Sequence, residues 1–185
     1  MPKPSSSNPT SSTPAPESVA LRTAHGVLRI LIVLNWVFGA AILAAFIVMP
    51  TQEWITKSFG VLPAAEVERL IWGFRGITLL GLVTIPLNYA ILKKLLAIVE
   101  TVRSSDPFVA ANANRLKAIA WTLTGLQLLG VAIGAIENAI STPAHPLHLD
   151  AGFSINGWLA VLLTFLLAEV FAKGTHMRED LEGTV

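Results

Sequence analysis

Four apolar runs, each of about 20 residues or more, constrain this chain more than any other feature of its sequence. They cover residues 27–49, 71–92, 119–140 and 153–172. Twenty residues of α-helix extend about 30 Å, which is the thickness of the hydrocarbon core of a bilayer. None of the runs alternates apolar and polar residues, as a transmembrane barrel strand would. The sequence therefore predicts an all-α, polytopic membrane protein with four transmembrane helices in an antiparallel bundle.

Composition excludes the main alternative, a large soluble core built from the same helices. Hydrophobic residues make up 53% of the chain and charged residues 14%, against about 25% charged residues in a soluble domain. So little polar sequence could not cover four apolar helices. The net charge of +1 gives no basic surface for direct nucleic acid binding. The chain has no cysteine, which excludes disulfides, thiolate zinc sites and thiol chemistry.

The distribution of Lys and Arg predicts the orientation. Ten of the 13 basic residues lie on the side of the two termini and the second connection, and the first and third connections hold two. Basic residues stay on the cytoplasmic side of membrane proteins. We therefore expect an inner-membrane protein with cytoplasmic N- and C-termini. Its parts would be a disordered Pro/Ser-rich cytoplasmic tail (1–18), a four-helix transmembrane domain (19–175) and an acidic cytoplasmic tail (176–185).

The second helix is predicted to continue beyond the membrane. Lys93–Arg103 contains no helix breaker, so the helix should run from Ala64 to about Ser104, and the third helix should begin near Ala110. The two helices would form a long cytoplasmic helical hairpin; alternatively, the bilayer lies further inward and Lys93 and Lys94 snorkel. In the loop before the second helix, Trp54, Ile55 and Phe59 could lie on the lipid interface.

Charged residues inside the apolar runs are the first candidates for a site. Arg75 and Glu137 each lie about one turn inside the same edge of neighbouring spans, which predicts a structural ion pair. Two alternatives stay open: a role in a substrate or proton path, or snorkelling of both side chains to the headgroups. Arg29 and Glu169 lie at matching depths of the first and fourth spans and could form a second, closing pair, unless both are solvated among the headgroups.

Other polar features carry weaker predictions. Asn35, Asn88 and Gln127 are expected to hydrogen-bond between helices, and the Gly130–Gly134 spacing predicts helix packing within the chain rather than dimerisation. In the third connection, His145, His148 and Asp150 could bind zinc, but an ordinary polar loop is the stronger interpretation. No catalytic arrangement or cofactor motif is recognisable, so we expect no enzyme activity and no cofactor.

Two short motifs stand out in the second connection and the C-terminal segment. Their residues are Asp106, Pro107, Phe108, Val109, Asn112, Arg115, Leu116 and Ile119 in the connection, and Ala168, Glu169, Val170, Phe171, Gly174 and the stretch 179–185 at the end. These motifs resemble the DUF2975 family of small bacterial membrane proteins, which typically have four predicted helices. The resemblance spans roughly residues 25–185 and implies no established reaction. Family members are often encoded beside a small helix-turn-helix regulator, which implies a membrane-anchored regulatory role.

The same residues have a physical interpretation. Pro107 forces Asp106 into an extended conformation, and Phe108 can pack the turn against a helix end. Residues in such a turn either hold it or bind a partner. We expect a non-enzymatic, regulatory membrane protein embedded in the lipid bilayer, with a cytoplasmic regulatory protein as its partner. The alternative is a small transporter or channel subunit, which would use Arg75 and Glu137 in a homo-oligomeric pore.

Overall fold

The computed structural model describes residues 19–48, 51–104, 108–142, 146–147, 149 and 151–182. This part of the chain is all-helical and contains α1 (Val19–Val48), α2 (Gln52–Phe59), α3 (Ala64–Arg103), α4 (Ala110–Ile140) and α5 (Ile155–Glu182). All but α2 are long and apolar enough to cross a membrane. The tail predicted at 1–18 lies outside the described residues.

The predicted limits of α3 and α4 are confirmed. α3 begins directly after Pro63, whose missing N–H costs nothing at a helix start, and ends before Ser104. α4 begins at Ala110, as expected. α5 continues through Glu182, beyond the end of its apolar run at residue 172. The helix therefore includes most of the segment predicted as an acidic tail.

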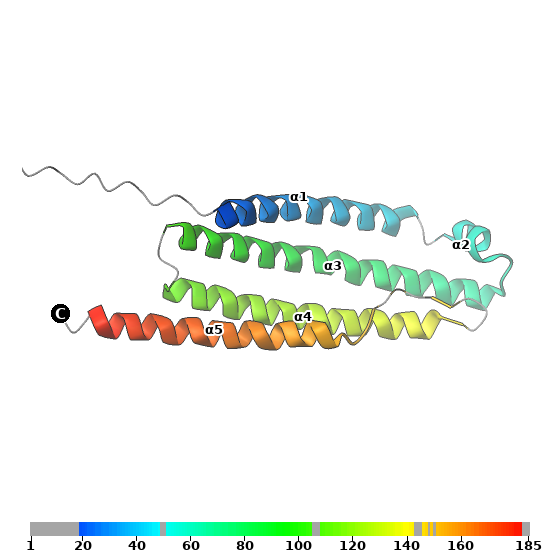
Figure 1. Ribbon diagram of the computed structural model, residues 1–185. Helices are drawn as coiled ribbons and strands as arrows, with labels where there is room; N and C mark the ends of the chain where they lie inside the picture. Colours follow the sequence, from blue (N-terminus) through cyan, green and yellow to red (C-terminus); the bar gives the residue numbers. More distant parts are fainter. Residues whose placement is uncertain are drawn as a thin grey trace, which may run out of the picture.

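The four long helices pack in the order α1, α3, α4, α5 (Figure 1). Within the described residues, α1 contacts only α3, and α5 contacts only α4 among the helices. Large apolar side chains remain exposed along all four, including Phe38, Leu79, Leu128 and Leu163. Lipid tails are as apolar as these side chains, so a membrane-embedded helix can leave most of its surface uncovered by protein. The open arrangement thus fits a bilayer and would aggregate in water.

Small residues bring the helices close together. A Cβ atom on Gly73 would overlap the side chain of Ile140, and one on Gly134 would lie 2.7 Å from the Cα of Gly152. Gly134 therefore packs against the segment that leads into α5. The prediction that the Gly130–Gly134 motif serves packing within the chain is confirmed. The predicted interhelical role of Asn35 is also confirmed, because its Nδ2 donates to the Ile85 carbonyl at 3.1 Å.

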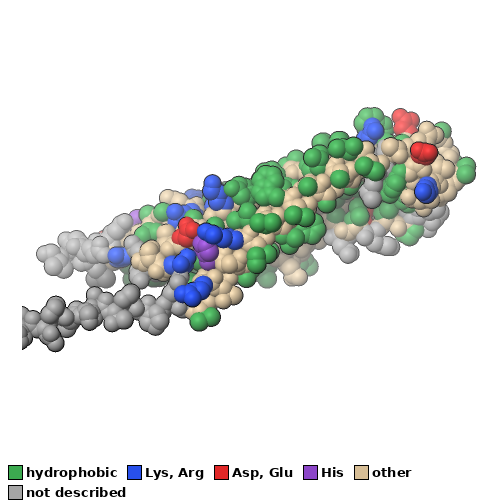
Figure 2. Space-filling view, turned by 90° about the horizontal axis from the view of Figure 1, so that it is seen from above, with side chains coloured by type: hydrophobic (Ala, Val, Ile, Leu, Met, Phe, Trp, Pro, Cys, Tyr) green, Lys and Arg blue, Asp and Glu red, His purple; other side chains and the backbone are tan. Residues whose placement is uncertain are grey.

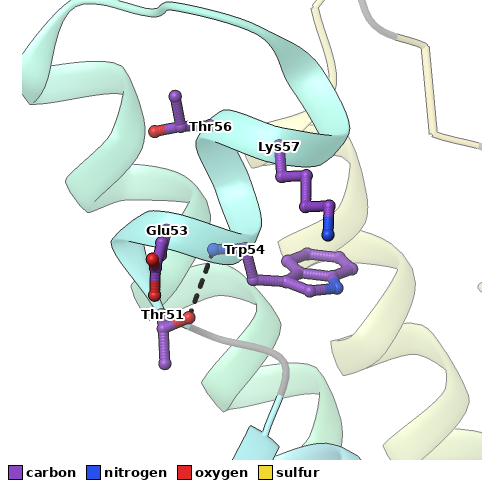
Figure 3. Close-up of a pocket in the computed structure, with 5 residues that line it drawn as sticks. All are labelled: Thr51, Glu53, Trp54, Thr56 and Lys57. Atoms are coloured by element: carbon purple, nitrogen blue, oxygen red, sulfur yellow. Dashed lines mark hydrogen bonds between the residues drawn. The ribbon is translucent and has the colours of Figure 1, made fainter.

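The short helix α2 corrects the expectation for the first connection. Thr51 caps it by accepting a hydrogen bond from the Trp54 backbone N–H at 3.2 Å (Figure 3). Gly60 ends it with a φ of 83°, a conformation that favours glycine. Ile55 is fully buried rather than on a lipid surface, since it packs with Val67, Leu70 and Ile140. Trp54 also turns inward, where its ring meets Phe74 edge-on at 5.7 Å.

Candidate functional site

The residues of the connecting motif gather where α3 ends and α4 begins. Asp106 and Pro107 lie outside the described residues. Phe108 precedes α4, and Asn112, Arg115 and Leu116 lie in its first two turns. The local sequence explains this arrangement, because a helix cannot continue through the residue before Pro107 and resumes only after Val109.

A hydrogen-bonded network joins the two helix ends. The side chain of Asn112 is completely buried, and its Nδ2 donates to Thr101 Oγ1 at 2.7 Å. Arg115 donates from one terminal nitrogen to Asn112 Oδ1 at 2.7 Å and to the carbonyl of Ala97 at 3.4 Å. Asparagine suits this place because its amide can donate and accept at once. The first turn of α4 is thereby fixed to the last two turns of α3.

An apolar face of α4 continues inward from this network. Leu116 is 5% exposed, and Ile119 and Ala120 are buried with it at helical spacing. Burial of such an apolar face stabilises the packing of α4 against its neighbours. The motif leucine is therefore a packing residue.

The second motif meets the first in space. The rings of Phe108 and Phe171 lie 5.5 Å apart at an interplanar angle of 34°. A Cβ atom on Gly174 would lie 3.0 Å from the ring of Phe108, so the missing side chain makes room for that ring. Phe108 still keeps 44% of its surface exposed. We call this set of contacts the turn clasp, which consists of Thr101, Phe108, Asn112, Arg115, Phe171 and Gly174.

The turn clasp lies at the end of the molecule that is richest in Lys and Arg. Figure 2 shows Lys and Arg gathered at one end of the molecule. This is the end at which α1 begins, α3 and α5 end and α4 starts (Figure 1). The acidic side chains described there include Glu100, Glu169 and Asp180. The basic residues are Arg22, Arg29, Lys93, Lys94, Arg103, Arg115, Lys117, Lys173 and Arg178.

The predicted ion pair between Arg75 and Glu137 is not formed. α3 faces α4 through Gly73 and Gly76, which lie against Ile140 and Ile136. Arg75 is two residues beyond Gly73, or about 200° around the helix, so it points away from α4. Its side chain is exposed, with Cζ 5.6 Å from the ring centre of Trp72. Arg75 and Glu137 therefore point in different directions within the chain.

Glu137 has a different partner, which sequence reasoning missed. Its side chain is 8% exposed, and Oε1 accepts a hydrogen bond from the backbone N–H of Leu149 at 2.6 Å. One turn further along the chain, Ser141 Oγ accepts from the N–H of Leu147 at 3.1 Å. Glu137 therefore holds the connection between α4 and α5. Every residue except proline has a backbone N–H, so the residue types alone could not predict this contact.

The closing pair of Arg29 and Glu169 is also not formed. Both side chains are exposed, and they belong to α1 and α5, which do not touch. Glu169 instead lines a hollow of about 170 Å³ between α4 and α5, together with Asn114 and Lys117. The order in which the helices pack places α3 and α4 between α1 and α5.

The zinc alternative falls outside what the structure describes. His145, His148 and Asp150 are not among the described residues. Within the part that is described, no group of three or more His, Cys, Asp or Glu side chains could hold a metal ion. The turn clasp itself contains amide, guanidinium, hydroxyl and aromatic groups, which suit it to holding helices and to contacting another molecule.

Comparison with known proteins adds one finding. The model of a family described as "Protein of unknown function (DUF2975)" matches residues 52–185, which include α2 to α5 and every turn-clasp residue. No curated protein and no solved structure matches the chain.

Proposed function

The chain belongs to the DUF2975 family, whose function is unknown, and we propose that it is a non-enzymatic, regulatory membrane protein that docks a cytoplasmic protein. In this proposal α1, α3, α4 and α5 cross the inner membrane as an antiparallel bundle. The turn clasp and both termini lie in the cytoplasm. The α3–α4 hairpin is the docking element.

The distribution of charge supports this orientation. Ten of the 13 Lys and Arg residues belong to the end of the molecule that carries the turn clasp or to the tail before α1. Translocation of such a cluster is disfavoured, which keeps it on the cytoplasmic side.

Helix length supports an extension into water. The 40 residues of α3 extend about 60 Å, roughly twice the hydrocarbon thickness. The apolar run of α3 ends near Leu92, so Lys93–Arg103 forms the part that projects. α4 packs against α3 and α5 packs against α4, so the extension belongs to a platform of several helices rather than to a loose loop (Figure 1).

The single observation that carries the proposal is that Phe108 is held in place by its neighbours and is still partly exposed. This side chain is held in place by Phe171 and Gly174, yet 44% of it stays exposed at the tip of the platform. An aromatic ring that is already ordered loses little side-chain entropy when a partner covers it. Aromatic residues are correspondingly enriched at the centres of protein interfaces.

The test is native purification of the tagged, full-length protein with variants at the two ends. Phe153 supplies a matched control, because it is a phenylalanine with 71% of its surface exposed at the opposite end of the molecule. Phe108→Ala should abolish co-purification of a cytoplasmic protein, and Phe153→Ala should preserve it. Phe108→Leu, which keeps apolar packing on Phe171, should fold normally and still weaken binding. Co-purification unchanged by both Phe108 variants would refute the docking role.

A further inference from the structure

A polar hollow of about 430 Å³ lies between α2 and α3, at the end of the molecule opposite the turn clasp. Its polar and aromatic lining consists of Thr51, Gln52, Glu68, Trp72 and Arg75, and we call it the Arg75 hollow. We infer that the Arg75 hollow binds the phosphate group of a membrane phospholipid. This inference depends neither on the orientation of the chain nor on the proposed docking function.

The hollow follows from how α2 lies against α3. Glu68, Trp72 and Arg75 recur at steps of four and three residues, so they share one face of α3. That face points away from α4, and the start of α2 with Thr51 and Gln52 borders it. Val67 and Ile71 complete the wall with apolar surface. The volume falls within the range of about 300–1,000 Å³ found for small-molecule sites.

An anion bound in the Arg75 hollow would stabilise the positive charge of Arg75. Arg75 lies in the apolar run that begins at Ile71, and no carboxylate of the described residues forms an ion pair with it. Glu68 lines the same hollow but is two turns away, about 10 Å along the helix axis. An unpaired guanidinium at this depth is costly, and a phosphate offers it two parallel charge-assisted hydrogen bonds.

Neighbouring groups orient the guanidinium and add donors. The ring of Trp72, 5.6 Å from Arg75 Cζ, attracts the cation and limits its directions. Trp72 is 63% exposed, as expected of a tryptophan at the level of lipid headgroups. The Thr51 hydroxyl accepts from Trp54 and keeps its own proton to donate, and the Gln52 amide can donate as well.

The hollow should bind a lipid rather than a soluble anion because it lies at the end of an apolar run. α2 buries Ile55 and Phe59 against the ends of α3 and α4, so it lies across the end of an apolar run. Phospholipid phosphates are concentrated at that level of a bilayer, where even a weak site is filled by mass action. The partly buried Ile71 then faces the glycerol and the first acyl carbons.

The experiment measures lipid retention by the purified, full-length protein. Delipidated protein in detergent is titrated with dioleoylphosphatidylglycerol, and bound lipid is counted by native mass spectrometry. Arg75→Gln should weaken binding of the tightest lipid about tenfold, the effect of one lost charge-assisted contact. Arg69→Gln is the matched control, because Arg69 is an exposed arginine of the same helix that lines a different hollow. It should weaken binding less than about twofold.

A second variant and a competition experiment also test the proposal. Trp72→Leu leaves Arg75 in place and should weaken binding about threefold, so a poorly folding Arg75 variant does not end the test. Millimolar inorganic phosphate should not displace the lipid. Equal losses in Arg75→Gln and Arg69→Gln would mean non-specific attraction and would overturn the proposal. Displacement by inorganic phosphate would overturn it as well, because the site would then recognise a soluble anion.

Discussion

Different interactions hold the helices together at the two ends of the molecule. At the turn clasp, directional hydrogen bonds from Asn112 and Arg115 and one aromatic contact fix α3, α4 and α5. At the α2 end, an apolar cluster around Ile55 and one bond from the Leu149 backbone to Glu137 do so. Directional contacts admit few residue types, whereas apolar contacts admit many of similar volume. This difference explains why the clasp is visible as a sequence motif and the α2 end is not.

The largest effect should come from the apolar end. Ile55→Ala removes a fully buried side chain and leaves a cavity, so the free energy of unfolding should fall by about 3 kcal/mol. Thermal unfolding in detergent, followed by circular dichroism, measures the loss. Val61→Ala is the control, because Val61 is 95% exposed and should be neutral. Equal effects of the two variants would show that α2 does not pack in solution as described.

Substitutions in the turn clasp should lower the free energy of unfolding less, and their effects should be coupled. Asn112→Ala leaves the Thr101 hydroxyl and the Arg115 guanidinium without a shared partner, at a cost of about 2 kcal/mol. Asn114→Ala, an exposed asparagine of the same turn, should cost almost nothing. The double variant of Asn112→Ala and Arg115→Ala should lose less than the sum of its parts. Simple addition would show that the two residues do not form one network.

A third variant pair tests close packing between the ends. A methyl group on Gly134 would meet the backbone of Gly152 and Ala151, so Gly134→Ala should destabilise the fold by about 1.5 kcal/mol. Gly130, one turn earlier, has only an ordinary contact at 3.6 Å with the Gly152 carbonyl. Gly130→Ala should therefore be neutral or slightly stabilising through helix propensity. The reverse order of melting temperatures would contradict the described approach of α4 to the α4–α5 connection.

The smallest effect concerns the aromatic part of the clasp. Phe108 and Phe171 should be coupled by about 1 kcal/mol beyond the area they bury. A double-mutant cycle with leucine at both positions isolates this coupling. A coupling energy near zero would mean that the ring contact adds no specificity, and the clasp would then depend on Asn112 and Arg115 alone.

The sequence predicted where the helices begin and end, but it did not predict the directions in which their side chains point. The ends of α3 and α4 followed from Pro63, Pro107 and the apolar runs, because helix rise and breakers are local properties. Arg75 and Glu137 lie at the same level along the α3–α4 pair, because Gly73 and Gly76 lie against Ile140 and Ile136. Their side chains point in different directions, which depends on the face through which α3 meets α4. That face is set by glycines that allow close approach, and a single sequence does not reveal which of its 13 glycines do so.

The measurement that tests the central claim most directly is the accessibility of single cysteines at the two ends. The chain has no native cysteine, so each introduced thiol reports alone. Val61 and Asn114 are suitable positions, because both are exposed and lie near α2 and the turn clasp respectively. A membrane-impermeant maleimide should label position 61 in intact cells and position 114 only after lysis. Labelling of position 114 in intact cells, with position 61 protected until lysis, would place the turn clasp outside the cytoplasm and contradict the account.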